Sequence, residues 1–171
     1  MSYVLVGGTF NCLHAGHEKI LRKAFSLGGD VLVCLTSDTM ADKKHLSEKI
    51  AGYGSRRKML VEFLSSGNFR GRAEIVKIED PFSEGLRPSL THIVVSPETK
   101  ANAEKINAMR AGRGLRPMKI VEVGWVLAAD GKPISGKRIR RGEISGVGRL
   151  LGRLSRGRSP EGSSRRARQK R

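Results

Sequence analysis

A short glycine- and histidine-rich stretch near the N-terminus constrains the fold more than any other part of this sequence. It reads GGTFNCLHAGH over residues 7–17 and follows the apolar run 3–6. We expect the apolar run to be a buried strand, and residues 15–27 to be a helix, because apolar residues recur there at helical spacing. A strand that ends in glycines and leads into a helix places backbone N–H groups and a helix N-terminus at one point. This arrangement predicts an anion-binding site.

The two histidines of this stretch are the first candidate functional residues. His14 and His17 are three positions apart and share one face of the first helical turn. Gly16 lies between them and lets the backbone approach a ligand closely. Two imidazoles at the positive end of a helix suit a polyphosphate whose charge grows as a bond breaks. A metal-binding pair is the alternative, but no further ligands stand at a suggestive spacing, so we predict no protein-held metal.

The rest of the chain alternates short apolar runs with helical patterns. After the first strand, we expect strands at 31–35, 73–78, 92–95 and 118–123, and after the first helix, helices at 55–64, 97–111 and 138–143; residues 42–49 read as a charged loop. Short strands without polar alternation, separated by helices, indicate an α/β fold: a parallel sheet of about five strands with helices on both faces. No apolar run is long enough to span a membrane, so we expect no membrane partner.

Charge divides the chain into two parts. Lys and Arg number 33 against 16 Asp and Glu, giving a formal net charge of +17, and residues 149–171 alone hold nine basic residues and one acidic residue. We therefore predict a folded domain over 1–148 and a disordered, Arg-rich tail over 149–171, because the tail cannot bury enough apolar surface to order itself. Such a tail favours non-specific contact with nucleic acid, as an accessory or an alternative function. The two cysteines are far apart, and no signal peptide precedes the first motif, so we expect a cytoplasmic protein.

The motifs resemble those of a known enzyme superfamily. GGTFNCLHAGH is similar to the GGTFDxLHxGH signature of the HIGH-superfamily nucleotidyltransferases, whose fold is Rossmann-like, and ISGKRIR at 134–140 stands where their second signature, ISSTxIR, is expected. The order of TSD at 36–38, VVSPET at 94–99, DGKP at 130–133 and RGEI at 141–144 resembles the archaeal type of phosphopantetheine adenylyltransferase. The resemblance covers roughly residues 3–145.

This resemblance implies an enzyme of coenzyme A biosynthesis. It would transfer the adenylyl group of ATP to 4′-phosphopantetheine, giving dephospho-CoA and pyrophosphate, by direct in-line attack with no covalent enzyme intermediate. Catalysis would then consist of positioning and electrostatic stabilisation. Mg²⁺ is the expected cofactor, held by the ATP phosphates and water. The alternative within the superfamily is a transferase for nicotinamide mononucleotide, FMN or glycerol 3-phosphate.

The resemblance also implies roles for individual residues. Thr9, Lys44 and His17 would be catalytic. Thr9 would bind the acceptor phosphate, together with Lys43 or Lys44, between which the sequence does not choose. The implied ATP-binding residues are Gly8, Thr9, Phe10 (through its backbone), His14, His17, Arg110, Ser135, Gly136, Lys137, Arg138 and Arg140. A plain surface position remains the alternative for Lys43, Lys44, Arg110 and Arg138.

Each of the two signatures departs from the family pattern. Asn11 stands where the family usually has Asp, and Gly136-Lys137 replaces Ser-Thr, so two hydroxyls are exchanged for a cation that can form a charge-assisted hydrogen bond. Residues 131–137 also spell GxxxxGK, but Arg138 follows where a P-loop requires Ser or Thr, so we predict no P-loop. Trp125 is expected to pack in the fold rather than to hold a base.

Overall fold

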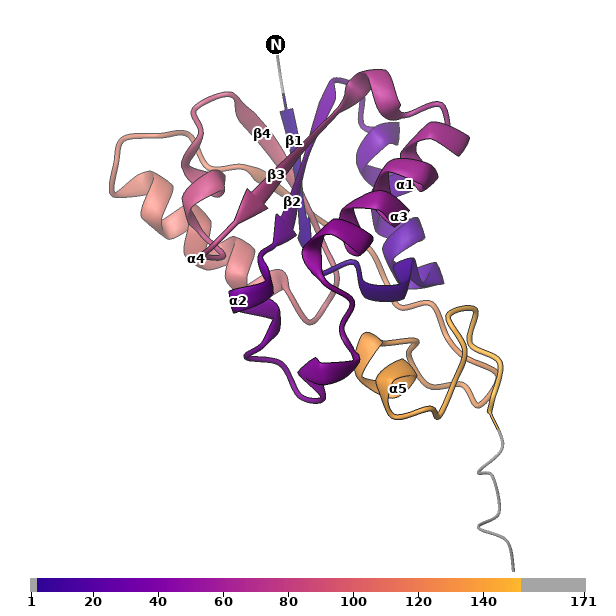
Figure 1. Ribbon diagram of the computed structural model, residues 1–171. Coiled ribbons are helices and arrows are strands. Elements are labelled where there is room, and N and C mark those ends of the chain that lie inside the picture. The colour runs from indigo at the N-terminus through magenta and orange to yellow at the C-terminus, as the bar shows by residue number, and fades with distance from the viewer. Residues whose placement is uncertain (1–2, 152–171) are drawn as a thin grey trace, which may run out of the picture.

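The computed structural model describes residues 3–151 (Figure 1). Five strands alternate with helices and a few short 3₁₀ turns. The strands are β1 (Tyr3–Gly8), β2 (Asp30–Thr36), β3 (Ala73–Ile78), β4 (Leu90–Val95) and β5 (Lys119–Glu122). The helices are α1 (Ala15–Ser26), α2 (Asp38–Ala41), α3 (Tyr53–Ser66), α4 (Lys100–Ala111) and α5 (Gly136–Arg140). The 3₁₀ turns are Asn11–Leu13, Ser47–Lys49, Arg70–Arg72 and Ser83–Leu86.

The strands form one parallel sheet in the order β3-β2-β1-β4-β5, which confirms the predicted α/β fold. The chain starts in the middle of the sheet, builds outward through β2 and β3, and then crosses over β1 to build β4 and β5 on the other side. The direction of winding therefore reverses between β1 and β4. In open α/β sheets the crevice at such a reversal, outside the carboxyl ends of the strands, is where ligands bind.

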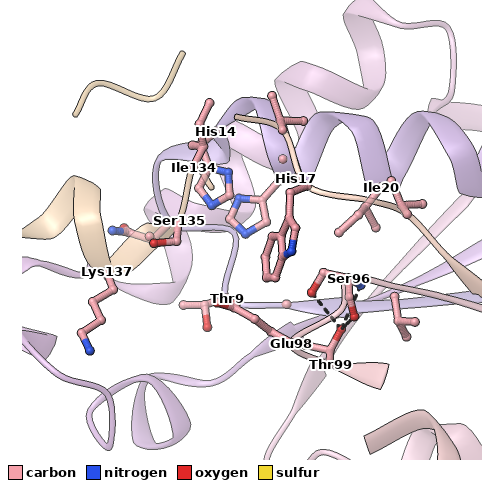
Figure 2. A pocket seen from close by; sticks show the side chains of 18 of the residues that line it. Thr9, His14, His17, Ile20, Ser96, Glu98, Thr99, Ile134, Ser135 and Lys137 are labelled. Atoms are coloured by element: carbon pink, nitrogen blue, oxygen red, sulfur yellow. Dashed lines mark hydrogen bonds between the residues drawn. The ribbon is translucent and has the colours of Figure 1, made fainter. Parts of the chain in front are cut away.

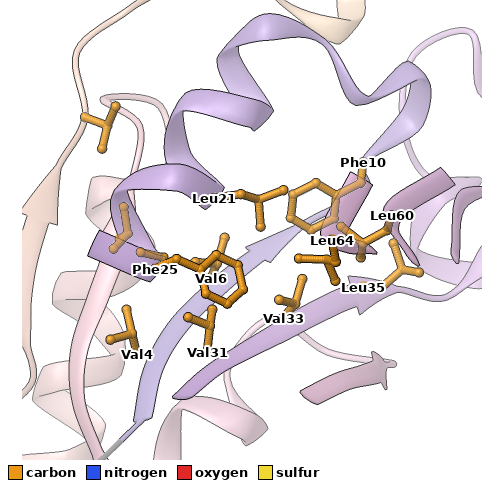
Figure 3. Close-up of a cluster of buried hydrophobic side chains, with 13 residues drawn as sticks. Val4, Val6, Phe10, Leu21, Phe25, Val31, Val33, Leu35, Leu60 and Leu64 are labelled. Carbon is orange, nitrogen blue, oxygen red and sulfur yellow. The ribbon is translucent and has the colours of Figure 1, made fainter. Parts of the chain in front are cut away.

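Helices cover both faces of the sheet, with α1 and α3 on one face and α4 on the other (Figure 1). On the first face, Leu21 and Phe25 of α1 and Leu60 of α3 pack against Val31 and Val33 of β2 (Figure 3). On the second face the core is formed by Leu5, Leu32, Ile93, Ala103 and Ile106, among others. Each central strand thus buries both of its faces, which explains its unbroken apolar sequence.

A small third cluster fastens the C-terminal segment beside the start of α1. Ala128, Ile134 and Ile144 are buried together, and Ala15 packs against them. The backbone supports this attachment, because the N–H of Ala15 donates to the carbonyl of Gly146 at 3.0 Å. As a result α5, drawn in orange in Figure 1, lies below the carboxyl ends of the strands.

Several predicted boundaries shift for local reasons. β1 continues through Gly7 and Gly8, which pair with Cys34 and Leu35 of β2, so the glycines extend the strand instead of ending it. The last helix is Gly136–Arg140 and not 138–143, because the Ser135 side chain caps it by accepting from the N–H of Arg138. α4 begins at Lys100 rather than at 97. The one-turn helix α2 was not predicted at all.

The first three residues of the predicted tail, 149–151, are joined to the segment that follows α5. The N–H of Arg149 donates to Oγ of Ser145 at 3.1 Å, and the N–H of Leu151 donates to the carbonyl of Glu143 at 3.0 Å. Composition cannot reveal this order, because it comes from backbone pairing in a tight turn. The remainder of the predicted tail, 152–171, lies outside the described residues. Among the helices of residues 3–151, none has the length and apolar character needed to cross a membrane.

Candidate active site

Two adjoining cavities open at the carboxyl ends of β1 and β4. The first has a volume of about 390 Å³ and is lined by the start of α1, the segments that follow β4 and β5, and the start of α5. The second has a volume of about 280 Å³ and lies on the α4 side, between the ends of β1, β2 and β4. The residues that line both cavities are Gly7, Gly8, Thr9, Lys44, Val94, Val95 and Thr99. Of these, Thr9 and Lys44 carry the polar side chains that the sequence singled out.

The two predicted histidines line the first cavity as a stacked pair (Figure 2). Their ring centroids are 3.7 Å apart with an interplanar angle of 23°. Phe10 supports the pair from the core, since its buried ring lies 5.1 Å from the His17 ring. Gly16 permits the arrangement, because a Cβ there would lie 3.1 Å from the His14 imidazole. The spacing of the motif thus places both imidazoles at one wall of the cavity.

Burial keeps both imidazoles neutral. Loss of solvent lowers the pKa of His14 to about 4, and lowers that of His17 to about 3 with a further contribution from the nearby His14 and Lys44 charges. Within residues 3–151, neither Nδ1 atom has a hydrogen-bond partner although both are buried. Buried polar atoms are nearly always paired, so these two nitrogens are unusual.

The turn between β1 and α1 is held in a strained conformation. Phe10, Cys12 and Leu13 have φ values of 49°, 63° and 33°, a region that costs a non-glycine residue about 1–3 kcal/mol. Asn11 fixes the turn, because its Oδ1 accepts from the N–H of Ala51 at 3.0 Å and its Nδ2 donates to the carbonyl of Lys49 at 3.4 Å. An Asp, the residue usual in the family motif, would retain only the first of these bonds, since an ionised carboxylate has no proton to donate.

Residues 42–50, which we call the lysine loop, contribute one side chain to the lining of both cavities. Lys44 lines both cavities and Lys43 lines neither, which separates the two lysines that the sequence left as alternatives. Lys44 remains open to solvent, yet partial burial and the charges of Arg140 and Arg56 lower its pKa. Nε of Arg140 donates to the carbonyl of His45 at 3.0 Å, and this bond joins the loop to α5.

The start of α5 forms the wall opposite the sheet. Ser135, Gly136, Lys137 and Arg140 all line the first cavity, as the resemblance implies for them. Figure 2 shows Ser135 and Lys137 to one side of the histidine pair and Ser96 and Thr99 to the other. Two cations and a hydroxyl from α5 therefore face the same cavity as the two neutral imidazoles, a combination suited to a polyphosphate.

Comparison with known proteins identifies the family. The family model described as cytidylyltransferase-like matches residues 5–142. The phosphopantetheine adenylyltransferase of Methanosarcina mazei is 42% identical over 153 residues, which are 88% of this chain and 97% of that protein. The enzyme of the same name from Pyrococcus abyssi is 44% identical over 152 residues, 88% of this chain and 96% of that one. The chain belongs to the archaeal phosphopantetheine adenylyltransferase family.

A solved structure has a similar fold. A protein with unknown function from Archaeoglobus fulgidus has a TM-score of 0.65 and 36% sequence identity over 72% of this chain and 89% of its own. Membership of the phosphopantetheine adenylyltransferase family confirms the prediction of a nucleotidyltransferase. The family's signatures and the two cavities coincide, since the first signature supplies Thr9, His14 and His17 and the second supplies the wall at α5.

Arg138, in the second signature of this adenylyltransferase family, does not line either cavity. Its guanidinium donates to Asp130 Oδ2 at 2.6 Å, to Glu143 Oε2 at 3.0 Å and to the carbonyl of Pro133 at 3.1 Å. The contact of Arg138 with ATP thus stays a prediction, which the position of its side chain in the structure does not support. Arg138 instead clamps the segment before α5 to the segment after it, and so holds Ser135 in place.

The structure also does not place Arg110 where the predicted phosphate contact would need it. Arg110 is 1% exposed, on the inner face of α4, and lines neither cavity. Its guanidinium donates to the carbonyls of Gly85, Arg87, Leu90 and Arg116 at 2.8–3.2 Å. All three nitrogens are thus used to tie surrounding turns and the start of β4 to the helix. A buried arginine and a surface arginine look alike in a helical sequence, so no local signal separated the two.

Trp125 was expected to pack within the fold, but it lines the first cavity and is 37% exposed. It follows β5, and the adjacent Gly124 is fixed by a 3.0 Å bond from Lys19 Nζ to its carbonyl. Trp125 therefore offers an aromatic face to whatever occupies the cavity. Glu98 also lines the first cavity and was not singled out from the sequence. Across residues 3–151, no three His, Cys, Asp or Glu side chains gather as a metal site would require.

Proposed function

We propose that this chain transfers the adenylyl group of ATP to 4′-phosphopantetheine, releasing pyrophosphate and dephospho-CoA. The observation that carries the proposal is the pair of cavities that meet at Thr9 and Lys44. A reaction between two phosphate groups needs two binding sites that share the point of contact, and these two side chains stand at that point. The names of the Methanosarcina and Pyrococcus relatives support the choice of substrates.

The lining of the cavities supports one assignment of the substrates. The first cavity holds the cations Lys137 and Arg140, the imidazoles and the Trp125 ring, which suit the triphosphate and the base of ATP. The second cavity combines apolar side chains such as Met40 and Ile106 with a few polar ones, which suits the pantetheine chain with its methyl groups and amides. In this arrangement the two reacting phosphates lie beside Thr9 and Lys44.

The chemistry follows from this placement. An oxygen of the acceptor phosphate attacks the α-phosphorus of ATP, a new P–O bond forms, and the bond to the β-phosphate breaks so that pyrophosphate leaves. Lys44 contributes positive charge where the two phosphates meet, and His17 donates an N–H to the oxygens on which charge develops. Thr9 orients the acceptor phosphate through its hydroxyl. No protein nucleophile takes part: Cys34 lines the second cavity, but burial raises the pKa of its thiol to about 12.

Mg²⁺ belongs to the ATP in this proposal. In the described part of the chain, Glu98 is the one acidic residue that lines the first cavity, and a single carboxylate fits an ion carried by phosphates and water better than a protein cage. Bound in this way, the ion would neutralise charge on the leaving pyrophosphate. The side chains of the chain itself bind and orient the two phosphates around it.

A substrate panel tests the proposal. The purified protein is incubated with ATP or CTP and with 4′-phosphopantetheine, nicotinamide mononucleotide, FMN or glycerol 3-phosphate, and the products are identified by mass spectrometry. We expect dephospho-CoA and pyrophosphate from ATP and 4′-phosphopantetheine alone. His17→Ala should lower the rate strongly, while the control His92→Ala, outside both cavities, should not. Consumption of a different acceptor, or equal rates for the two variants, would contradict the assignment.

A further inference from the structure

Thr9, which the proposed reaction uses to orient the acceptor phosphate, is itself held by two buried residues, Thr36 and Arg56, to which the motifs assign no role. Thr9 follows β1 and Thr36 ends β2, and the register of these strands pairs Gly8 with Leu35, so the two threonines are neighbours. Both are nearly buried, at 7% and 6% exposed. Arg56, which is part of α3 and fully buried, contacts both threonines.

Arg56 binds the backbone of both strand ends. Its Nη1 donates to the carbonyl of Thr9 at 3.0 Å and to the carbonyl of Thr36 at 2.9 Å. Its Nε donates to the carbonyl of Ala51 at 2.7 Å, and its Nη2 donates to Asp38 Oδ1 at 2.8 Å. One guanidinium therefore fixes the ends of β1 and β2 together with α2 and the segment that leads into α3.

The same contacts set the direction of a hydrogen-bond chain. Nη1 of Arg56 also lies 3.4 Å from Oγ1 of Thr36, in a shared bond, and a guanidinium can only donate. Oγ1 of Thr36 in turn donates to Oγ1 of Thr9 at 3.2 Å. Since Oγ1 of Thr9 accepts this bond, the single proton of Thr9 is left to point away from Thr36. Thr9 lines both cavities, so the proton is available to a ligand oxygen there.

We propose that Arg56 and Thr36 are positioning residues that direct the hydroxyl proton of Thr9 toward the acceptor phosphate. Arg56 donates to Thr36, Thr36 donates to Thr9, and Thr9 donates to the phosphate. Each hydroxyl accepts one bond and donates one, so the chain has a single direction, and such chains strengthen each member. The inference rests on the proposed function, because it needs a phosphate in the second cavity beside Thr9.

The test is a double-mutant cycle on the two hydroxyls. Thr36→Val removes the donor to Thr9 and leaves the Thr36 carbonyl that Arg56 binds, so the fold should persist; urea unfolding and ATP titration check this. We expect kcat/KM for 4′-phosphopantetheine to fall about fivefold, the worth of one neutral hydrogen bond, with KM for ATP unchanged. Thr36→Ser, which keeps the hydroxyl, should restore the wild-type value.

The cycle separates positioning from a structural role. If Thr36 acts through Thr9, then Thr36→Val should cost nothing further in a Thr9→Val background. Additive losses, a wild-type rate for Thr36→Val, or no rescue by Thr36→Ser would overturn the inference. Failure of the proposed function would appear differently, because the wild-type protein would then form no dephospho-CoA and Thr36 would have no rate to change.

Discussion

The stacked histidines make the stability of the ligand-free protein depend on pH. The pKa of His14 is lowered to about 4 and that of His17 to about 3, while an exposed histidine in the unfolded chain titrates near 6.5. Between pH 6.5 and pH 4 the unfolded chain therefore binds up to two protons that the folded chain does not. Stability is fully present above pH 6.5 and falls as the pH is lowered through this window.

The size of this loss follows from the two pKa values. One pKa unit corresponds to about 1.4 kcal/mol, and pH 5 lies about 1.5 units below the unfolded value, so each histidine lowers the free energy of unfolding by about 2 kcal/mol there. The pair together accounts for about 4 kcal/mol between pH 7.5 and pH 5, a large part of the 5–15 kcal/mol that typically stabilises a domain.

Urea unfolding followed by circular dichroism at pH 7.5, 6.5, 5.5 and 5.0 measures this loss. The comparison is between the wild type, the double variant His14→Gln/His17→Gln, and the control His45→Gln/His92→Gln, whose side chains line neither cavity. The wild type and the control should lose about 4 kcal/mol between pH 7.5 and 5.0, and the first double variant should lose little. A flat wild-type curve, or the same loss in the His14/His17 variant, would refute the reasoning.

Three further outcomes are expected. At pH 5.5, the protein should take up protons when ATP binds, because the phosphate charge raises the pKa of His14 and His17. Calorimetry in buffers of different ionisation enthalpy measures this uptake, and zero uptake would contradict the expectation. Arg138→Met removes the bond to Asp130 and should lower the midpoint of thermal unfolding, while adenylyl transfer survives. Loss of transfer at an unchanged midpoint would instead indicate a direct ATP contact. Truncation after Leu151 should leave the transfer rate unchanged and abolish any salt-sensitive RNA binding of the full chain, and a large loss of rate would give the tail a role in the reaction.

The fold was predictable because its buried strands appear in the sequence as short apolar runs. A strand buried on both faces must be apolar throughout, and the run 31–35 lies within β2 as predicted. The run 73–78 coincides with the edge strand β3, which is only half-buried and also carries Glu74 and Lys77. The ends of elements were less predictable, since they depend on single bonds such as the cap that Ser135 gives to α5. The one-turn helix α2 is too short to show a period.

Some residues of the site were predictable from the sequence and others were not. Thr9, His14 and His17 are fixed by one local turn, so their sequence spacing predicts their place in the cavity. The arginines depend on tertiary packing that no local pattern records. Arg56 stands in the run Arg56-Arg57-Lys58 and reads as part of a solvated surface, yet the fold encloses it completely.

In the proposed reaction the two substrates react where the cavities meet, and variants of the neighbouring residues Lys43 and Lys44 in the lysine loop test this most directly. Lys44 lines both cavities and its neighbour Lys43 lines neither, so each variant controls for the other. In assays of dephospho-CoA formation at saturating ATP and 4′-phosphopantetheine, Lys44→Ala should lower kcat about 100-fold, the effect of removing one preorganised group that stabilises transition-state charge. Lys43→Ala should keep the wild-type rate. Equal rates for the two variants, or full activity of Lys44→Ala, would contradict the account.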